Sequence, residues 1–87
     1  MGIHFDDPAW YQYVSWQSLD RKTLKRINAL LASIRRNGYQ SIGKVEKLKG
    51  DLSGLYSVRI DGKNRLVFYV NGDDVIIASC SGHYGDT

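Results

Sequence analysis

The sequence predicts an α+β fold, in which two N-terminal helices pack on one face of a small, mainly antiparallel twisted β-sheet. Two observations lead to this prediction. Up to about residue 38, apolar residues recur at the three- and four-residue spacing of helices, and beyond it short β-rich segments alternate with turn-rich clusters. Antiparallel sheets commonly leave one face in contact with solvent. We therefore expect the face opposite the helices to be available for a ligand.

The length and composition indicate a single globular domain, residues 1–87. A chain of 87 residues has a marginal core unless a second copy or a partner adds buried surface. The longest apolar runs are far shorter than the ~20 residues needed to span a bilayer, and the start MGIHFDD resembles neither an export signal nor a lipidation motif. We expect a cytoplasmic protein that does not bind membranes. Its single cysteine, Cys80, is expected to be a buried, reduced thiol.

The first element expected is a short strand at residues 2–5, where apolar and polar residues alternate. Asp6 or Asp7 can then cap a helix whose first turn contains Pro8. The residues expected to form the core stripe of this helix are Trp10, Tyr13, Val14 and Gln17.

A second helix is expected to begin near Asp20 and to end at Gly38, a residue suited to a left-handed C-cap. Its apolar side chains follow one another at spacings of three, four and three residues. The stripe expected to face the core consists of Leu24, Ile27, Leu31 and Ile34.

The second half of the chain contains β-rich segments at residues 44–50, 55–60, 65–70 and 75–80. The clusters DLSG, DGKN and NGDD between them favour turns, so three or four antiparallel strands should follow the helices.

The hairpin formed by residues 55–60 and 65–70 has a register that the sequence itself indicates. Apolar residues of both strands share one face only if the loop has an odd number of residues, and the three residues DGK satisfy this condition. This register places Arg59 opposite Arg65 on the other face. Because like charges facing each other are destabilising, the two arginines either hold an anion such as a phosphate or turn apart into water.

Positive charge is concentrated in one part of the chain. The net charge is +3, yet residues 21–50 carry nine Lys and Arg against a single acid, a local net charge of +8. Such segregation is typical of a protein that meets a polyanion on one side. The alternative is a helix that exposes a solvated cationic face.

The single acid in that segment, Glu46, is also the only Glu of the chain, and Lys44, Lys47 and Lys49 surround it in the sequence. Nearby cations favour the ionised carboxylate. Glu46 is therefore either the partner in a salt bridge or an available proton acceptor.

Together these residues match the requirements of RNA cleavage without a metal. Such a reaction needs a base for the 2′-hydroxyl proton, cations for the charge on phosphorus, and an acid for the departing 5′-oxygen. Glu46 suits the base, Arg59 and Arg65 suit the cations, and His83 suits the acid because histidine titrates near neutrality. Tyr84 can stack on a base or donate to the phosphate.

The motifs GKVEKLKGDLSGLYSVRI, NRLVFYV and the late HY, together with WYQYVSWQSLDRKTLKRINALLASIRRNGY, resemble the YoeB toxins of the RelE superfamily across nearly the whole chain. The resemblance implies the RelE-like fold, with Glu46 as general base, Arg65 as transition-state phosphate ligand, His83 as general acid and Tyr84 as an orienting group. The positions of Lys49 and Arg59 match family residues that assist phosphate binding. The chain differs from many family members in lacking prolines on either side of Glu46 and in continuing for three residues after Tyr84.

What the resemblance implies about function is ribosome-dependent cleavage of mRNA in the A site of the 70S ribosome, with no cofactor or metal. It also implies a YefM/Phd-type antitoxin, a homodimer, and indirect binding to operator DNA through the antitoxin complex.

Three other functions share part of these features. A ParE-like gyrase-directed toxin would have the same fold and basic helix but would not need the Glu, His and Tyr set. A non-catalytic RNA- or DNA-binding module would need only the basic surface, and substitution of His83 would leave its binding intact. A free-standing ribonuclease would cleave naked RNA as well as ribosome-bound RNA.

Overall fold

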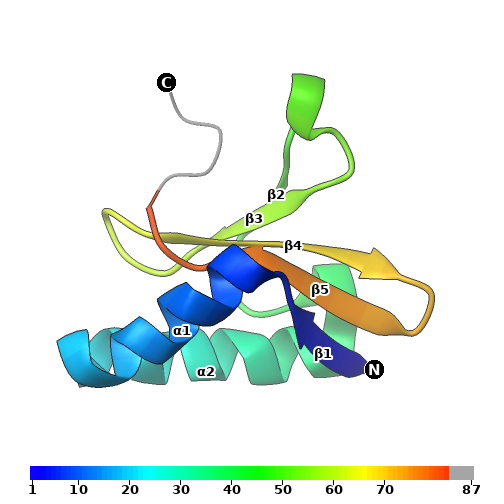
Figure 1. The fold of residues 1–87 in the computed structure, drawn as a ribbon. Helices are drawn as coiled ribbons and strands as arrows, with labels where there is room; N and C mark the ends of the chain where they lie inside the picture. Colours follow the sequence, from blue (N-terminus) through cyan, green and yellow to red (C-terminus); the bar gives the residue numbers. More distant parts are fainter. Residues whose placement is uncertain (83–87) are drawn as a thin grey trace.

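Within residues 1–82, the part of the chain that the computed structural model describes, a five-stranded sheet carries two helices on one face (Figure 1). His83 and Tyr84, and the predictions made for them, lie outside the described residues. The helices are α1 (Asp7–Leu19) and α2 (Arg21–Asn37), and the strands are β1 (Gly2–Phe5), β2 (Val45–Lys47), β3 (Tyr56–Arg59), β4 (Arg65–Asn71) and β5 (Asp74–Ser79). Short 3₁₀ turns occupy Gly38–Gln40 and Gly50–Leu52.

The sheet has the strand order β1-β5-β4-β3-β2. Strand β1 runs parallel to β5, and all other neighbours are antiparallel. Both helices connect β1 to β2 along the chain, and Figure 1 shows them together below the sheet. The predicted fold class, helices on one face of a mainly antiparallel sheet, is confirmed.

Both helices begin where the sequence predicts, although the side chain of Asp6, at the N-cap position of α1, makes no capping hydrogen bond. Pro8 lies in the first turn of α1, where its missing N–H costs no hydrogen bond. Asp20 is the N-cap residue of α2, and its carboxylate accepts hydrogen bonds from the backbone N–H groups of Thr23 and Lys22. The hydrogen bond from Thr23 is the main reason that the pKa of Asp20 is lowered. Helix α2 ends at Gly38, whose φ of 61° only glycine adopts readily.

The core stripe predicted for α1 is confirmed only at Tyr13, which packs against the core. Its other three members, including Gln17, are exposed. Trp10 is 50% exposed and Val14 is 44% exposed. The helix instead turns Gln12 and Trp16 toward the end of the sheet: the backbone N–H of Cys80 donates to Gln12 Oε1 (2.7 Å), and Trp16 Nε1 donates to the Cys80 carbonyl (2.9 Å). Backbone groups at the end of β5 would otherwise be buried without partners, which is costly. Hydrogen bonding therefore decides which side of α1 faces the sheet.

The core stripe predicted for α2 is largely confirmed. Ile27 and Ile34 are fully buried, while Leu24 and Leu31 are half-buried. Leu30, which the prediction did not include, is fully buried as well. These side chains meet the inner face of the sheet, whose buried members include Val58, Leu66, Phe68, Val75 and Ile77.

The β3–β4 hairpin has the predicted register. Arg59 is paired with Arg65 and Val58 with Leu66, and the backbone N–H of Ile60 closes the three-residue loop by donating to the Asn64 carbonyl (3.0 Å). The apolar face of the hairpin therefore turns toward the helices, and the arginines lie on the opposite face.

The side chain of Cys80 is fully buried, as predicted. Burial disfavours the thiolate and raises the pKa of the thiol to about 11. In residues 1–82 neither helix has the length and apolar character that crossing a bilayer requires.

Candidate active site

The side chains of Glu46, Ser57 and Arg65 belong to the sheet face that turns away from the helices. Their chain neighbours Val58 and Leu66 are buried in the core, and successive side chains of a strand point to opposite faces. Glu46 of β2 is paired with Ser57 of β3. Arg65 begins β4, diagonally across from Ser57, a separation that a long side chain can span. The sheet register thus gathers three polar side chains from three strands.

Arg65 and Glu46 are in direct contact. Arg65 Nη2 donates to Glu46 Oε1 at 3.2 Å, and the two groups form an ion pair. Arg65 Nε donates to the hydroxyl of Ser57. The Arg65 side chain is 21% exposed and the Glu46 side chain is 53% exposed, so the guanidinium is held against the sheet while the carboxylate reaches into solvent.

The predicted salt bridge of Glu46 exists, but its partner is not one of the neighbouring lysines. In residues 1–82, no ion pair joins Glu46 to Lys44, Lys47 or Lys49. Lys49 is exposed at the start of the Gly50–Leu52 turn. The structure therefore brings together the predicted base and the predicted phosphate ligand but does not connect Lys49 to them by a hydrogen bond.

Arg59 lies opposite Arg65 in the register, yet the two guanidinium groups have different partners. Arg59 Nε donates to the carbonyl of Asp61 in the hairpin loop (3.2 Å), whereas Arg65 turns to Ser57 and Glu46. This arrangement relieves the repulsion without an anion, so the pairing alone does not require a bound phosphate. The phosphate-binding role of Arg59 stays a prediction.

Gly82, the last residue described, lies beside the start of β4. Its carbonyl accepts a hydrogen bond from the backbone N–H of Arg65 (3.0 Å), and its own N–H donates to Asn64 Oδ1 (2.9 Å). Gly82, the residue before His83 in the chain, is therefore held next to Arg65.

Two residues of this region, Ser57 and Asn64, were missed by the sequence analysis. The signal for Ser57 was the predicted hairpin register, which places this small polar residue on the same face as Arg65 and diagonally across from it. Asn64 gave no separate signal, because asparagine is expected in a turn-rich cluster whether or not it has a further role.

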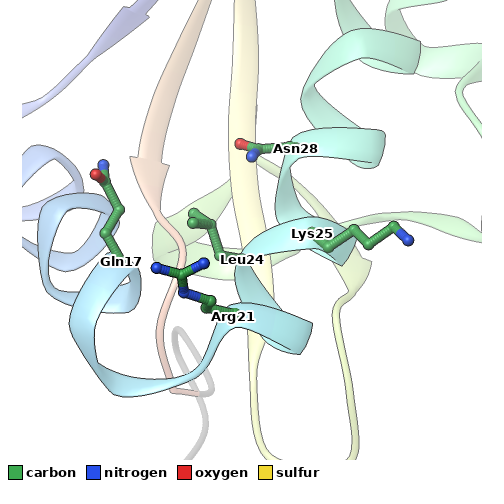
Figure 2. Close-up of a pocket in the computed structure, with 5 residues that line it drawn as sticks. All are labelled: Gln17, Arg21, Leu24, Lys25 and Asn28. Atoms are coloured by element: carbon green, nitrogen blue, oxygen red, sulfur yellow. The ribbon is translucent and has the colours of Figure 1, made fainter.

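A surface groove lies away from this cluster, where α1 meets α2. It has a volume of about 330 Å³ and is lined by Gln17, Arg21, Leu24, Lys25 and Asn28. Figure 2 shows Gln17, Arg21 and Leu24 gathered at the turn between the helices, with Lys25 pointing away from them. None of the predicted site residues lines it. The groove displays cations of the basic segment, residues 21–50, and its position separates it from the Glu46–Arg65 pair.

Residues 5–84 match the family model described as the YoeB-like toxin of bacterial type II toxin-antitoxin systems. The chain belongs to this family. A toxin YoeB of Streptomyces coelicolor is 46% identical over 97% of this chain and 100% of its own length. Among solved structures, a YoeB dimer and a YoeB–YefM complex, both from Staphylococcus aureus, are 47% and 46% identical. Each superposes with a TM-score of 0.87 over 97% of this chain and 98% of its own.

The family match of this YoeB-like toxin therefore confirms the resemblance seen in its sequence motifs. The match includes the strands that bear Glu46, Ser57 and Arg65, and it extends to the His83–Tyr84 pair. It makes the chain a toxin of a type II toxin-antitoxin system.

Proposed function

We propose that this toxin is a ribosome-dependent endoribonuclease that cleaves mRNA in the A site by metal-free acid–base catalysis. The observation that supports this most directly is the contact between Glu46 and Arg65, because it combines a carboxylate and a cation on the exposed sheet face. In this proposal Glu46 is the general base, Arg65 binds the reacting phosphate, His83 is the general acid and Tyr84 orients the nucleotide.

The reaction joins two atoms of the same nucleotide and releases the next one. The 2′-oxygen attacks phosphorus while its proton passes to the Glu46 carboxylate, and a 2′-O–P bond forms. The P–O5′ bond breaks, and His83 gives a proton to the departing 5′-oxygen. The products are a 2′,3′-cyclic phosphate and a 5′-hydroxyl. Arg65 stabilises the negative charge that develops on the phosphoryl oxygens.

The ion pair between Glu46 and Arg65 suggests how substrate binding prepares the base. A phosphate that binds the Arg65 guanidinium competes with Glu46 for its Nη2 group. Ser57 keeps hold of Nε during this exchange, so the guanidinium stays in place while the carboxylate is released. Substrate binding thereby frees the proton acceptor next to the 2′-hydroxyl.

The dependence on the ribosome follows from the shape of the site. Glu46 and Arg65 lie on a sheet face, and the cavities found in residues 1–82 are lined by other residues. Among residues 1–82, Glu46 and Arg65 thus lie on an open sheet face and line none of these three cavities. Holding a flexible strand in line for attack can supply ~7–11 kcal/mol of the barrier, and we propose that the ribosome supplies this positioning. The ribosomal A site holds mRNA in a bent conformation, and its rRNA offers phosphates to the basic segment, residues 21–50.

The proposed partners are a second copy of the chain and a YefM/Phd-type antitoxin. The Staphylococcus aureus relatives form a YoeB dimer and a YoeB–YefM complex. The +8 net charge of residues 21–50 suits an acidic antitoxin segment that folds as it binds. Operator DNA would be contacted indirectly, through the antitoxin complex. Lys49 and Arg59 are proposed to assist phosphate binding at the edge of the site.

The proposal is tested by a single-turnover time course on two substrates. Purified toxin at sub-micromolar concentration is mixed either with programmed 70S ribosomes or with the same mRNA alone, and EDTA is added to the naked RNA as a control. We expect 2′,3′-cyclic phosphate products on the ribosome and a rate on naked mRNA that is lower by at least roughly 10³-fold, about 4 kcal/mol. Comparable rates on both substrates would identify a general ribonuclease instead.

A further inference from the structure

The segment that leads into the proposed general acid is attached to the β3–β4 hairpin at one residue, Gly82. The first attachment is a backbone hydrogen bond, in which Arg65 N donates to the Gly82 carbonyl (3.0 Å). The second comes from a side chain, since Gly82 N donates to Asn64 Oδ1 (2.9 Å). Gly82 has a φ of 73°, which other residues rarely adopt. Chain direction at this point therefore depends on both contacts and on the glycine.

The side-chain amide of Asn64 is held in a defined orientation by Asp61. Asn64 Nδ2 donates to both carboxylate oxygens of Asp61, at 3.1 Å each. The same carboxylate accepts the backbone N–H groups of Lys63 and Asn64 at 2.8 Å, and the bond from Lys63 is the main cause that lowers the pKa of Asp61. Because Nδ2 must face Asp61, Oδ1 faces Gly82.

These contacts exceed what the hairpin turn itself requires. The turn is closed by backbone bonds to the Asn64 carbonyl and by the Asp61 carboxylate. The bond from Asn64 Oδ1 leaves the turn and reaches a residue 18 positions later in the chain. Its target is the residue covalently bonded to His83, and its origin is the residue covalently bonded to Arg65.

We propose that Asn64 is a positioning residue for the cleavage reaction, which fixes Gly82, the residue that precedes the general acid His83 in the chain, beside Arg65. This inference rests on the proposed function, because the role given to Asn64 is to position the general acid of that reaction. Asp61 acts one step further away by orienting the amide. Loss of the amide leaves Glu46, Ser57 and Arg65 in place and affects the step in which the 5′-oxygen is protonated.

The test compares two substrates that differ in their need for a general acid. One is a programmed A-site mRNA with the ordinary 5′-oxygen at the scissile phosphate, and the other has sulfur at that bridging position. A thiolate departs without being protonated, so loss of the acid matters only for the oxygen substrate. The full-length variants are Asn64→Ala, His83→Gln, Arg65→Ala and, as a matched control, Asn71→Ala, which changes an exposed asparagine at the other end of β4.

We expect Asn64→Ala to lower kcat on the oxygen substrate by roughly 10- to 100-fold with little change in KM, because a small misplacement of an acid has effects of this size. On the sulfur substrate its rate should return to within roughly threefold of the wild-type rate, as for His83→Gln. Arg65→Ala should stay slow on both substrates, and Asn71→Ala should match the wild type. Recovery on the sulfur substrate also shows that Asn64→Ala is folded.

Two results overturn the inference alone. In one, Asn64→Ala cleaves the oxygen substrate as fast as Asn71→Ala does. In the other, it is equally slow on both substrates while His83→Gln recovers on sulfur, which indicates a general structural defect. If His83→Gln cleaves the oxygen substrate at the wild-type rate, the general-acid assignment of the proposed function fails, and the role of Asn64 fails with it.

Discussion

Replacing Arg65 by alanine should separate the contribution of this side chain to stability from its contribution to cleavage. The substitution removes the ion pair with Glu46 and the hydrogen bond to Ser57. Glu46 is 53% exposed, so solvent screens the ion pair, which contributes ~0–1 kcal/mol. The Ser57 side chain is buried, and a hydroxyl left without a partner costs ~1–3 kcal/mol.

The expected loss of cleavage rate is larger than the small loss of folding stability would cause by itself. A cation aimed at the charge that develops in the transition state is a large catalytic term, and its removal should slow cleavage by ~10²-fold or more. The expected stability loss is smaller than the ~5–15 kcal/mol that keeps a domain folded. Arg65→Ala should therefore be folded but cleave at least ~10²-fold more slowly than the wild type.

The assay is single-turnover cleavage on programmed ribosomes, with thermal melting of each variant in the same buffer. Arg59→Ala is the matched comparison, because Arg59 lies opposite Arg65 but donates to a loop carbonyl instead of to Ser57 and Glu46. It should lose less activity and mainly weaken RNA binding. If Arg65→Ala melts at a higher temperature than the wild type and cleaves at the wild-type rate, Arg65 is only a surface charge and the proposed site is wrong.

Three further predictions concern toxicity, the antitoxin and the buried thiol. Production of the wild-type chain alone should halt bacterial growth, whereas His83→Gln should be harmless, folded and able to bind the antitoxin; equal growth arrest by both would contradict the role of His83. Association with the antitoxin should slow as salt rises, because charge attraction from residues 21–50 is screened, and on-rates that do not change with ionic strength would exclude electrostatic guidance. Because burial raises the pKa of Cys80 to about 11, iodoacetamide at pH 8 should label the native protein much more slowly than the urea-unfolded chain, as measured by mass spectrometry. Equal labelling rates would show that the thiol is accessible.

The sequence by itself determined the features that depend on local patterns. Helical spacing and capping residues indicated α1 and α2, and turn-rich clusters separated the strands. The β3–β4 register, with Arg59 opposite Arg65, followed from the parity of a three-residue loop. The family motifs named the candidate site residues. Each of these signals involves residues that are close in the chain, or motifs that can be read directly from it.

Only the tertiary structure decided which side chains meet across the fold. The buried side of α1 was predicted wrongly for most of its residues. Gln12 accepts a hydrogen bond from the backbone N–H of Cys80, and Trp16 donates one to the Cys80 carbonyl, 64 or more positions away, while Trp10 is exposed. The pairing of Glu46 with Arg65, rather than with an adjacent lysine, depends on the packing of three strands. Such contacts depend on where distant backbone segments are brought together, and neither periodicity nor turn chemistry carries that information.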